Sequence, residues 1–336
     1  MTERRLTIGD VAAEAGVSVA TVSKVINGRW GVAEGTEARV RAVIEDLGYH
    51  SSLVAQSLRS RRTNVIGVLI VDIEPFSAEL LKGVARALRG TGYELVVFSG
   101  CGADDQVGWE RRYLSRVSGT LCDGALLVTP SSVDVTFGAP VVAVDHNAGS
   151  STLPSVDSDN FSGAVTATEY LLGLGHRRIG FLAGREDLES ARLRKRGYRH
   201  ALETAGLAVD PTLIRAGEFQ QESAEDAARQ LLANGGNPTA IFAANDVSAL
   251  ATISIARSLG LRVPDDLSVI GFDNVPESAL SDPPLTTIEQ PIQQMGFDAT
   301  RLLIGLIEDE PVASTHTRLP TKLVVCGSCR ALEETR

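Results

Sequence analysis

The sequence is poor in cysteine and has no long apolar run, and both shortages narrow the class of protein it belongs to. Its 336 residues contain four cysteines, Cys101, Cys122, Cys326 and Cys329. The last two form a CGSC pair, but a zinc site needs four ligands and no second ligand pair is evident, so we expect free thiols. No apolar stretch reaches the ~18 residues of a membrane span, and the start MTERRLTIGD has no signal-peptide core. We therefore expect a cytoplasmic protein with no membrane partner.

Motifs of catalysis are also lacking. The sequence has no glycine–lysine phosphate loop, and its glycines near 173–184 do not form GxGxxG after a strand. Its five histidines do not have the spacing of metal ligands, and His176, just before a predicted strand, suits a structural role. We therefore expect no enzyme activity, no cofactor and no metal.

Acidic residues outnumber basic ones, but not in the N-terminal part of the chain. The net charge is −10, yet residues 1–63 hold nine Lys/Arg and seven Asp/Glu, which gives +2 there and −12 over the rest. A mildly basic head on an acidic body indicates a small anion-binding module on a separate domain.

Residues 1–50 have the apolar spacing of three short helices. Thr7 is predicted to cap the first helix, which ends at Gly16, and Ser18 to cap the second. The third helix stops at Gly48. Apolar residues form the inner faces of the three helices: Ile8, Val11, Ala12 and Ala15, then Val22, Val25 and Ile26, then Val40, Val43, Ile44 and Leu47. A helix, a tight turn through 16–18 and a second amphipathic helix predict a helix-turn-helix, with a generic three-helix bundle as the alternative.

Residues 51–63, SSLVAQSLRSRRT, differ in character from the helices before them. Leu53, Val54, Ala55 and Leu58 form an apolar strip, and three arginines follow it. The segment is either a solvated linker or a helix that becomes ordered only on DNA, where phosphates neutralise the arginines.

From residue 64 onward the pattern alternates between short apolar runs and amphipathic stretches. The runs, read as buried parallel strands, are 65–71, 94–98, 124–129, 140–144, 178–184, 239–245 and 267–273. The helical stretches between them include 76–90, 162–174, 223–234 and 247–259. Repeated strand–helix units predict an α/β fold with open parallel sheets, and two sets of them predict two similar lobes.

The residues that follow the predicted strands are candidates for a ligand site, because ligands of open α/β sheets bind at the carboxyl ends of the strands. They are polar: Asp72, Thr129, Asp145, Asn245 and Asp273. Such side chains pair with vicinal hydroxyls, so they predict a saccharide pocket. Two arginines and two aromatic residues are predicted to complete it: Arg192, Arg194, Phe76 and Phe219.

Seven motifs occur along the chain in a fixed order: TIGDVAAEAGVSVATVSKVING, VAQSL, LLGLGHRRIGFLAG, SARLR-x-x-GY, ANDVSALA, LSVIGFDN and PPLTTIEQP. In combination, from Leu6 to about Cys329, they resemble the lactose-repressor (LacI/GalR) family. The resemblance implies a homodimer whose two heads bind a near-palindromic double-stranded operator, with the helix from Ser18 to Asn27 in the major groove and a hinge helix in the minor groove.

The resemblance also implies which residues contact DNA. They are Thr7, Ser18, Val19, Ala20, Thr21, Ser23, Lys24, Asn27, Tyr49, Ala55 and Leu58. Val19 and Ala20 can make only apolar contacts, for example to thymine methyl groups, so Lys24 is the one strong polar reader. The chain departs from the family at Ala33 and Glu34, where serine is frequent, and in the pre-hinge stretch YHSSLVAQ, which lacks the usual proline.

The body resembles the family's periplasmic-binding-protein-like effector domain. The resemblance implies a DNA-binding domain at 1–50, a hinge at 51–63 and an effector-binding and dimerisation domain at 64–336. Lobe 1 would hold 64–159 and 291–320, and lobe 2 would hold 160–290 and 321–331. The resemblance also places six residues in the cleft between the lobes: Phe76, Asp145, Arg194, Phe219, Asn245 and Asp273. The tail after Cys329 has no heptad repeat, so we expect no tetramer-forming coiled coil.

We therefore expect a nucleoid-associated repressor of sugar-utilisation genes that is released from its operator by a small saccharide. The alternatives are a purine-type corepressor, a sugar-binding transport component and an enzyme with a regulatory head. A missing signal peptide argues against the transport component, and the missing catalytic cluster argues against the enzyme.

Overall fold

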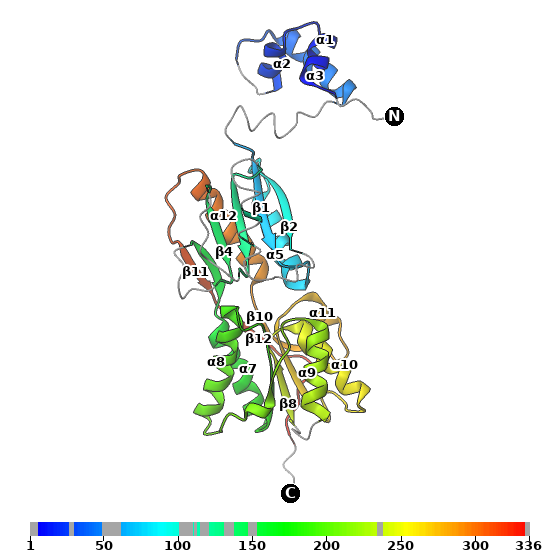
Figure 1. The fold of residues 1–336 in the computed structure, drawn as a ribbon, viewed down its shortest axis with the longest axis vertical. Coiled ribbons are helices and arrows are strands. Elements are labelled where there is room, and N and C mark those ends of the chain that lie inside the picture. Colours follow the sequence, from blue (N-terminus) through cyan, green and yellow to red (C-terminus); the bar gives the residue numbers. More distant parts are fainter. Residues whose placement is uncertain are drawn as a thin grey trace. The chain divides into compact units, whose positions relative to one another are not determined.

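The structure is a computed structural model that describes residues 6–26, 30–48, 62–100, 110, 113–114, 121–130, 138–146, 153–233 and 238–332 (Figure 1). The chain divides into two compact units, Met1–Thr63 and Asn64–Arg336. Most of the predicted hinge and four predicted DNA contacts lie outside the described residues: Asn27, Tyr49, Ala55 and Leu58.

The first unit contains the three predicted helices, α1 (Ile8–Glu14), α2 (Val19–Ile26) and α3 (Glu34–Leu47). Thr7 and Asp10 form a reciprocal capping box at the start of α1, as the spacing predicted. Gly16 and Gly48 follow α1 and α3 with φ of +62° and +59°, a left-handed conformation that glycine adopts without a steric penalty. The core between the helices is small and apolar: Val11, Ala12, Ala15, Val22, Val25 and Val40.

The second unit contains two six-stranded sheets. The first has the order β11-β5-β4-β3-β1-β2, and every pairing in it is parallel. Its strands are β1 (Val65–Ile70), β2 (Glu94–Ser99), β3 (Gly124–Val128), β4 (Val141–Val144), β5 (Ser155–Ser158) and β11 (His316–Leu319).

The second sheet has the order β12-β10-β9-β8-β6-β7, and it is parallel except for the pairing of β12 with β10. Its strands are β6 (Ile179–Ala183), β7 (Ile214–Ala216), β8 (Ala240–Ala243), β9 (Ser268–Asp273), β10 (Thr286–Glu289) and β12 (Lys322–Val324). The chain passes between the sheets after β5, after β10 and after β11.

Helices cover both sheets. In the second lobe, α7 (Asn160–Gly173) pairs with α8 (Glu189–Thr204) on one face, and α9 (Gln221–Ala233) with α10 (Asp246–Ser258) on the other (Figure 1). The short 3-10 helix Pro211–Leu213 and α11 (Pro276–Leu280) lie in connections. None of the described helices is long and apolar enough to cross a membrane.

In the first lobe, α5 (Pro75–Leu88) packs closely on α12 (Ile292–Ile307). Two glycines permit this approach. A Cβ on Gly83 would lie 1.9 Å from the Gln293 carbonyl oxygen, and one on Gly296 would lie 2.3 Å from that of Leu80. Any side chain at either position would therefore push the helices apart.

The predicted fold class, a helix-turn-helix head followed by a two-lobed α/β body with parallel sheets, is confirmed. The alternation of apolar runs did not reveal β5, β7, β10, β11 and β12. These strands have only three or four residues each, too few for an apolar run, and each contains at least one polar side chain. β5 (SVDS) is buried along its whole length although three of its four residues are polar. Its burial depends on hydrogen bonds to other segments, which no local hydropathy pattern records.

Candidate functional site

The exposed face of α2 in the first unit presents the predicted DNA-reading positions. Ser18 Oγ accepts from the Thr21 amide at 3.2 Å and caps the helix. Val22 and Val25 are buried in the head, so Val19, Ala20 and Lys24 are left exposed on the opposite face. The helix therefore offers two small apolar side chains and one ammonium group to a partner.

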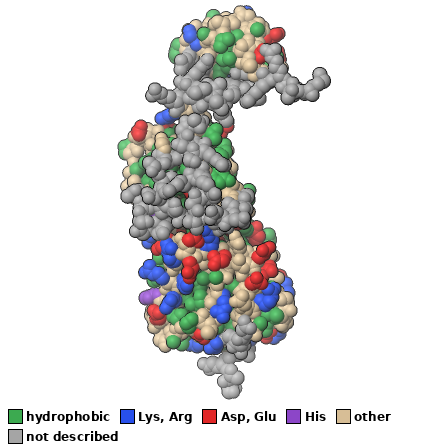
Figure 2. Space-filling model, viewed as in Figure 1, with side chains coloured by type: hydrophobic (Ala, Val, Ile, Leu, Met, Phe, Trp, Pro, Cys, Tyr) green, Lys and Arg blue, Asp and Glu red, His purple; other side chains and the backbone are tan. Residues whose placement is uncertain are grey.

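A cavity of about 650 Å³ lies between the lobes of the second unit. The structure brings together eight of the nine predicted pocket residues in its lining: Asp72, Phe76, Thr129, Asp145, Arg194, Phe219, Asn245 and Asp273. Figure 2 shows acidic and basic side chains intermixed over the visible face of the second lobe.

The first lobe contributes strand ends to this cavity. Asp72 follows β1, Thr129 follows β3 and Asp145 follows β4, and the parallel register of the three strands places these ends at one edge. Thr129 and Asp145 have φ of +46° and +53°, so the backbone turns sharply where the side chains enter the cavity. Phe76 comes from the first turn of α5 and is 8% exposed.

The second lobe contributes the opposite wall. Asn245 caps α10 by accepting from the Ser248 amide at 3.0 Å, and its Nδ2 donates to the Phe219 carbonyl at 3.2 Å. Asn245 therefore fixes the loop that carries the Phe219 ring. The Arg194 guanidinium lies over the Phe272 ring, 3.9 Å from its centroid, and 5.5 Å from that of Phe219.

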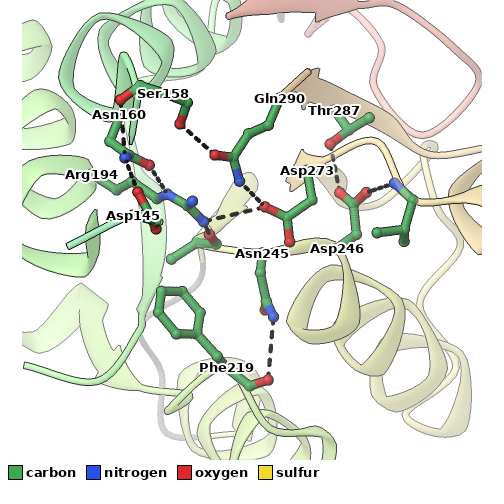
Figure 3. A network of polar contacts seen from close by, with 12 residues as sticks. Asp145, Ser158, Asn160, Arg194, Phe219, Asn245, Asp246, Asp273, Thr287 and Gln290 are labelled. Carbon is green, nitrogen blue, oxygen red and sulfur yellow. Dashed lines mark hydrogen bonds and ion pairs between the residues drawn. The ribbon is translucent and has the colours of Figure 1, made fainter. Parts of the chain in front are cut away.

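A polar network runs along the back of the cavity (Figure 3). Arg194 Nη1 lies 3.5 Å from Asp273 Oδ1 and also donates to the carbonyl oxygen of Ala244. Gln290 Nε2 donates to Asp273 Oδ1 at 2.6 Å, and Gln290 Oε1 accepts from Ser158 Oγ. Burial raises the pKa of Asp273 well above its ordinary value, while the nearby Arg194 opposes the rise.

Carboxyl groups dominate the charge of the cavity. Among the residues that the structure describes, its lining has two arginines against six acidic residues, which are Asp72, Glu74, Asp145, Glu218, Glu222 and Asp273. Arg185 is paired with Asp187 at 2.6 Å, and Arg194 with Asp273 at 3.5 Å, so each of these two described arginines already has a carboxyl partner. Burial, and then the charge of Asp72, raises the pKa of Glu74 to about 7. The Glu74 carboxyl is therefore both a donor and an acceptor near neutral pH.

Several lining residues were not predicted. Arg185 follows β6 and Glu74 follows Asp72 in the β1–α5 loop, so the strand-end rule itself could have found both. Glu218, Gln220, Gln221 and Glu222 lie beside Phe219. The prediction for Arg192 was wrong: its guanidinium donates to Glu189 at 2.8 Å and to the Glu186 carbonyl at 2.9 Å, away from the lining. Arg192 and Arg194 are two residues apart on a helix, so they point to different faces.

His176 has the structural role that was predicted. It is buried, and its ring bonds to Thr239 and Ser268 and to the Arg330 carbonyl. Within the described parts of the chain, no group of three or more His, Cys, Asp and Glu side chains is arranged to hold a metal ion.

Comparisons with known proteins agree with both units. Residues 7–52 match the family described as "Bacterial regulatory proteins, lacI family", and residues 168–329 match "Periplasmic binding protein-like domain". The chain is 38% identical over 335 residues to the HTH-type transcriptional repressor PurR of Photobacterium profundum, covering 97% of this chain and 99% of that protein.

Two solved structures are similar over nearly the whole chain. One is a transcriptional regulator CelR–cellobiose complex, 34% identical with a TM-score of 0.73, covering 96% of this chain and 100% of that one. The other is the lac repressor dimer bound to operator and the anti-inducer ONPF, 27% identical with a TM-score of 0.84, covering 98% and 100%. With its helix-turn-helix head and its cleft between two α/β lobes, this chain belongs to the lacI family of bacterial regulatory proteins and is a DNA-binding transcriptional repressor.

Proposed function

We propose that this repressor binds a near-palindromic operator as a cytoplasmic homodimer without catalytic activity, and that a neutral saccharide in the cleft releases it. The observation that carries the proposal is the cavity between the lobes, whose lining combines carboxyl and amide side chains with the ring of Phe219. The regulator CelR, 34% identical, was solved with cellobiose, which supports a saccharide ligand for this chain as well.

The charge of the cleft favours a neutral ligand. Asp145 and Asp273, at strand ends of opposite lobes, are suited to accept from sugar hydroxyls, and the Phe219 ring is suited to pack on a sugar face. A phosphorylated ligand needs cations that are free to bind it. Both arginines in the described part of the lining have carboxyl partners, so a phosphate would meet mainly carboxyl groups.

At the operator, we propose that specificity rests on Lys24, on apolar contacts from Val19 and Ala20, and on the bent centre of the site. Lys24 donates to guanine O6 or N7. The capping groups Thr7 and Ser18, with Thr21 and Ser23, hold phosphates or base edges. Four further residues complete the contacts to DNA: Asn27, Tyr49, Ala55 and Leu58. Of these, Leu58 is inserted between the base pairs of the central step and opens it.

A thermal-shift screen tests the effector class. The panel contains cellobiose, xylose, ribose, glucose 6-phosphate and hypoxanthine. We expect a neutral sugar to raise the melting temperature by mass action, and we expect glucose 6-phosphate to leave it unchanged. A shift with hypoxanthine alone would replace the proposal by the purine-type effector, the alternative that the family resemblance left open.

An operator assay tests the sign of regulation. A duplex selected from a random library by the full-length protein is titrated with and without the sugar that shifts the melting temperature. We expect the sugar to weaken operator binding about 5- to 150-fold, the range of typical allosteric coupling. Tighter binding with sugar would make the sugar a corepressor. If the selection yields no duplex that the protein binds, the operator-binding part of the proposal is overturned.

A further inference from the structure

A buried asparagine at the first crossing between the lobes links two charged groups of the cleft. Asn160 is the first residue of α7 and is 2% exposed, and it is not part of the cavity lining. Its Nδ2 donates to Asp145 Oδ1 at 2.9 Å and to the Ser158 carbonyl at 3.2 Å, and its Oδ1 accepts from Arg194 Nε at 2.8 Å (Figure 3). Asp145 follows a strand of the first sheet, whereas Arg194 lies on a helix of the second lobe. One amide thus connects both walls of the cleft.

Only a side chain that donates and accepts can make this bridge. A carboxylate at position 160 could accept from Arg194 but could not donate to Asp145, and a cation could not accept from Arg194. The partners also fix the amide orientation, because a flipped amide would set its NH₂ against the guanidinium N–H and its oxygen against the Asp145 carboxylate. Bonds to ionised groups are roughly twice as strong as neutral ones, so the bridge is strong for its size.

The second crossing leads to the same charged group. Gln290, which is 3% exposed, connects Asp273 to Ser158 of β5, and Asp273 lies beside Arg194. The hydrogen bonds therefore run from Asp145 through Asn160 to Arg194 and Asp273, and return to the first sheet through Gln290. The two amides lie at two of the three points where the chain passes between the lobes, after β5 and after β10.

We propose that Asn160 is a positioning residue that sets the relative orientation of the two lobes in the effector-free protein. The inference rests on the proposed function, because the walls that Asn160 connects are those of the proposed effector site. A ligand hydroxyl that bonds to Asp145 or Arg194 uses the same side chains that form hydrogen bonds with Asn160. Ligand binding and lobe orientation are then parts of one equilibrium.

A distance measurement on the full chain tests this without effector or DNA. Two exposed residues, Arg301 of α12 in the first lobe and Glu203 of α8 in the second, are replaced by non-natural amino acids. Each of these carries a spin label attached by bioorthogonal chemistry. The labelled chain is mixed with excess unlabelled chain, so that only distances within one chain are recorded. In Asn160→Asp, a like-charge pair replaces the bond to Asp145 while the acceptor for Arg194 remains. We expect the mean distance to change by more than about 2 Å, the scale of domain rearrangements.

Two further variants separate positioning from general stability. The double variant Asp145→Asn/Asn160→Asp restores an amide–carboxylate pair with the roles exchanged, and we expect it to return the wild-type distance. Thr168→Val removes a buried hydrogen bond of 2.9 Å to the Ala164 carbonyl in the same helix, and we expect a lower melting temperature with an unchanged distance. If Asn160→Asp does not fold, Asn160→Ala is measured in its place.

An Asn160 variant whose distance distribution coincides with that of the wild type overturns the proposal. A double variant that keeps the altered distance also overturns it, because the donor and acceptor would then not be the cause. Failure of every sugar to shift the melting temperature would instead count against the proposed function, since no ligand enters the distance measurement.

Discussion

The head and the two-lobed unit build their functional surfaces in different ways. In the head, the exposed positions of α2 come from eight consecutive residues, Val19–Ile26. In the two-lobed unit, the cavity lining extends from Val71 to Asp273 and needs strand ends from both sheets. A helix face follows from the 3.6-residue period, whereas a cleft exists only once two sheets have formed. Substitutions at the exposed positions of α2 should therefore change recognition alone, while substitutions in the cleft should change both binding and folding.

The largest effect should come from Arg194→Ala in the cleft. The substitution removes the buried guanidinium from the Asn160 amide oxygen, the Ala244 carbonyl and Asp273, and Asp273 keeps Gln290 as a donor. Breaking such a pair from one side typically costs ~3–5 kcal/mol of the free energy of unfolding. We expect a loss of this size in urea denaturation, together with loss of saccharide binding.

The matched control for Arg194 is Arg229→Ala in a surface pair. Arg229 and Asp226 are 2.8 Å apart with side chains 50% and 74% exposed, and such pairs contribute at most about 1 kcal/mol. If Arg194→Ala and Arg229→Ala lowered the free energy of unfolding equally, residues of the cleft would be no more important for folding than residues of an exposed helix face.

The next largest effect should come from Lys24→Ala in the head. If Lys24 contacts a guanine edge, its removal should weaken binding by ~1–3 kcal/mol at one base pair of the operator. Affinities for operators altered one base pair at a time measure this effect. Because Lys24 is exposed and the helix core is unchanged, we expect no change in the stability of either unit. Equal losses on all the operators would make Lys24 a phosphate contact instead.

A smaller, pH-dependent effect should come from Glu74→Gln in the cleft. The raised pKa of Glu74, about 7, means that the folded protein resists ionising this group. Ionisation of Glu74 therefore lowers the free energy of unfolding. This loss is absent at pH 4, grows as the pH rises above the ordinary pKa of a glutamate, and levels off above pH 7. The full rise in pKa corresponds to about 3 kcal/mol, but Glu74 is only half-buried, so solvent screening reduces the effect. We expect the variant to match the wild type at pH 4 and to exceed its stability by about 1 kcal/mol at pH 8. Parallel stability–pH curves for the two proteins would contradict this expectation.

The smallest effect should come from Thr7→Ala, which removes the capping box of α1. Thr7 Oγ1 lies 2.7 Å from Asp10 Oδ2 and accepts from the Asp10 amide at 3.4 Å. Loss of such a cap costs about 0.5–1 kcal/mol and should affect only the head. Amide hydrogen exchange should accelerate in α1 and remain unchanged in the two-lobed unit. Faster exchange in β1 or β9 would show that the units are not independent.

Local sequence alone was sufficient for the three head helices, for the central strands and for the eight predicted residues that line the cavity. Each of these depends on short-range patterns: helical period, capping residues, buried apolar runs, and polar residues directly after strands. The patterns were sufficient because parallel strands in register bring their carboxyl ends to one edge, whatever the loops between them.

Tertiary structure alone decided the rest. Burial raises the pKa of Glu74, and Asn160 acquires partners 15 and 34 residues away in sequence. The helical period puts Arg192 and Arg194 on different faces, and only the tertiary structure decided that Arg194 is the one that enters the cleft. Desolvation and long-range hydrogen bonds depend on which segments meet in space, and no period along the chain records those encounters.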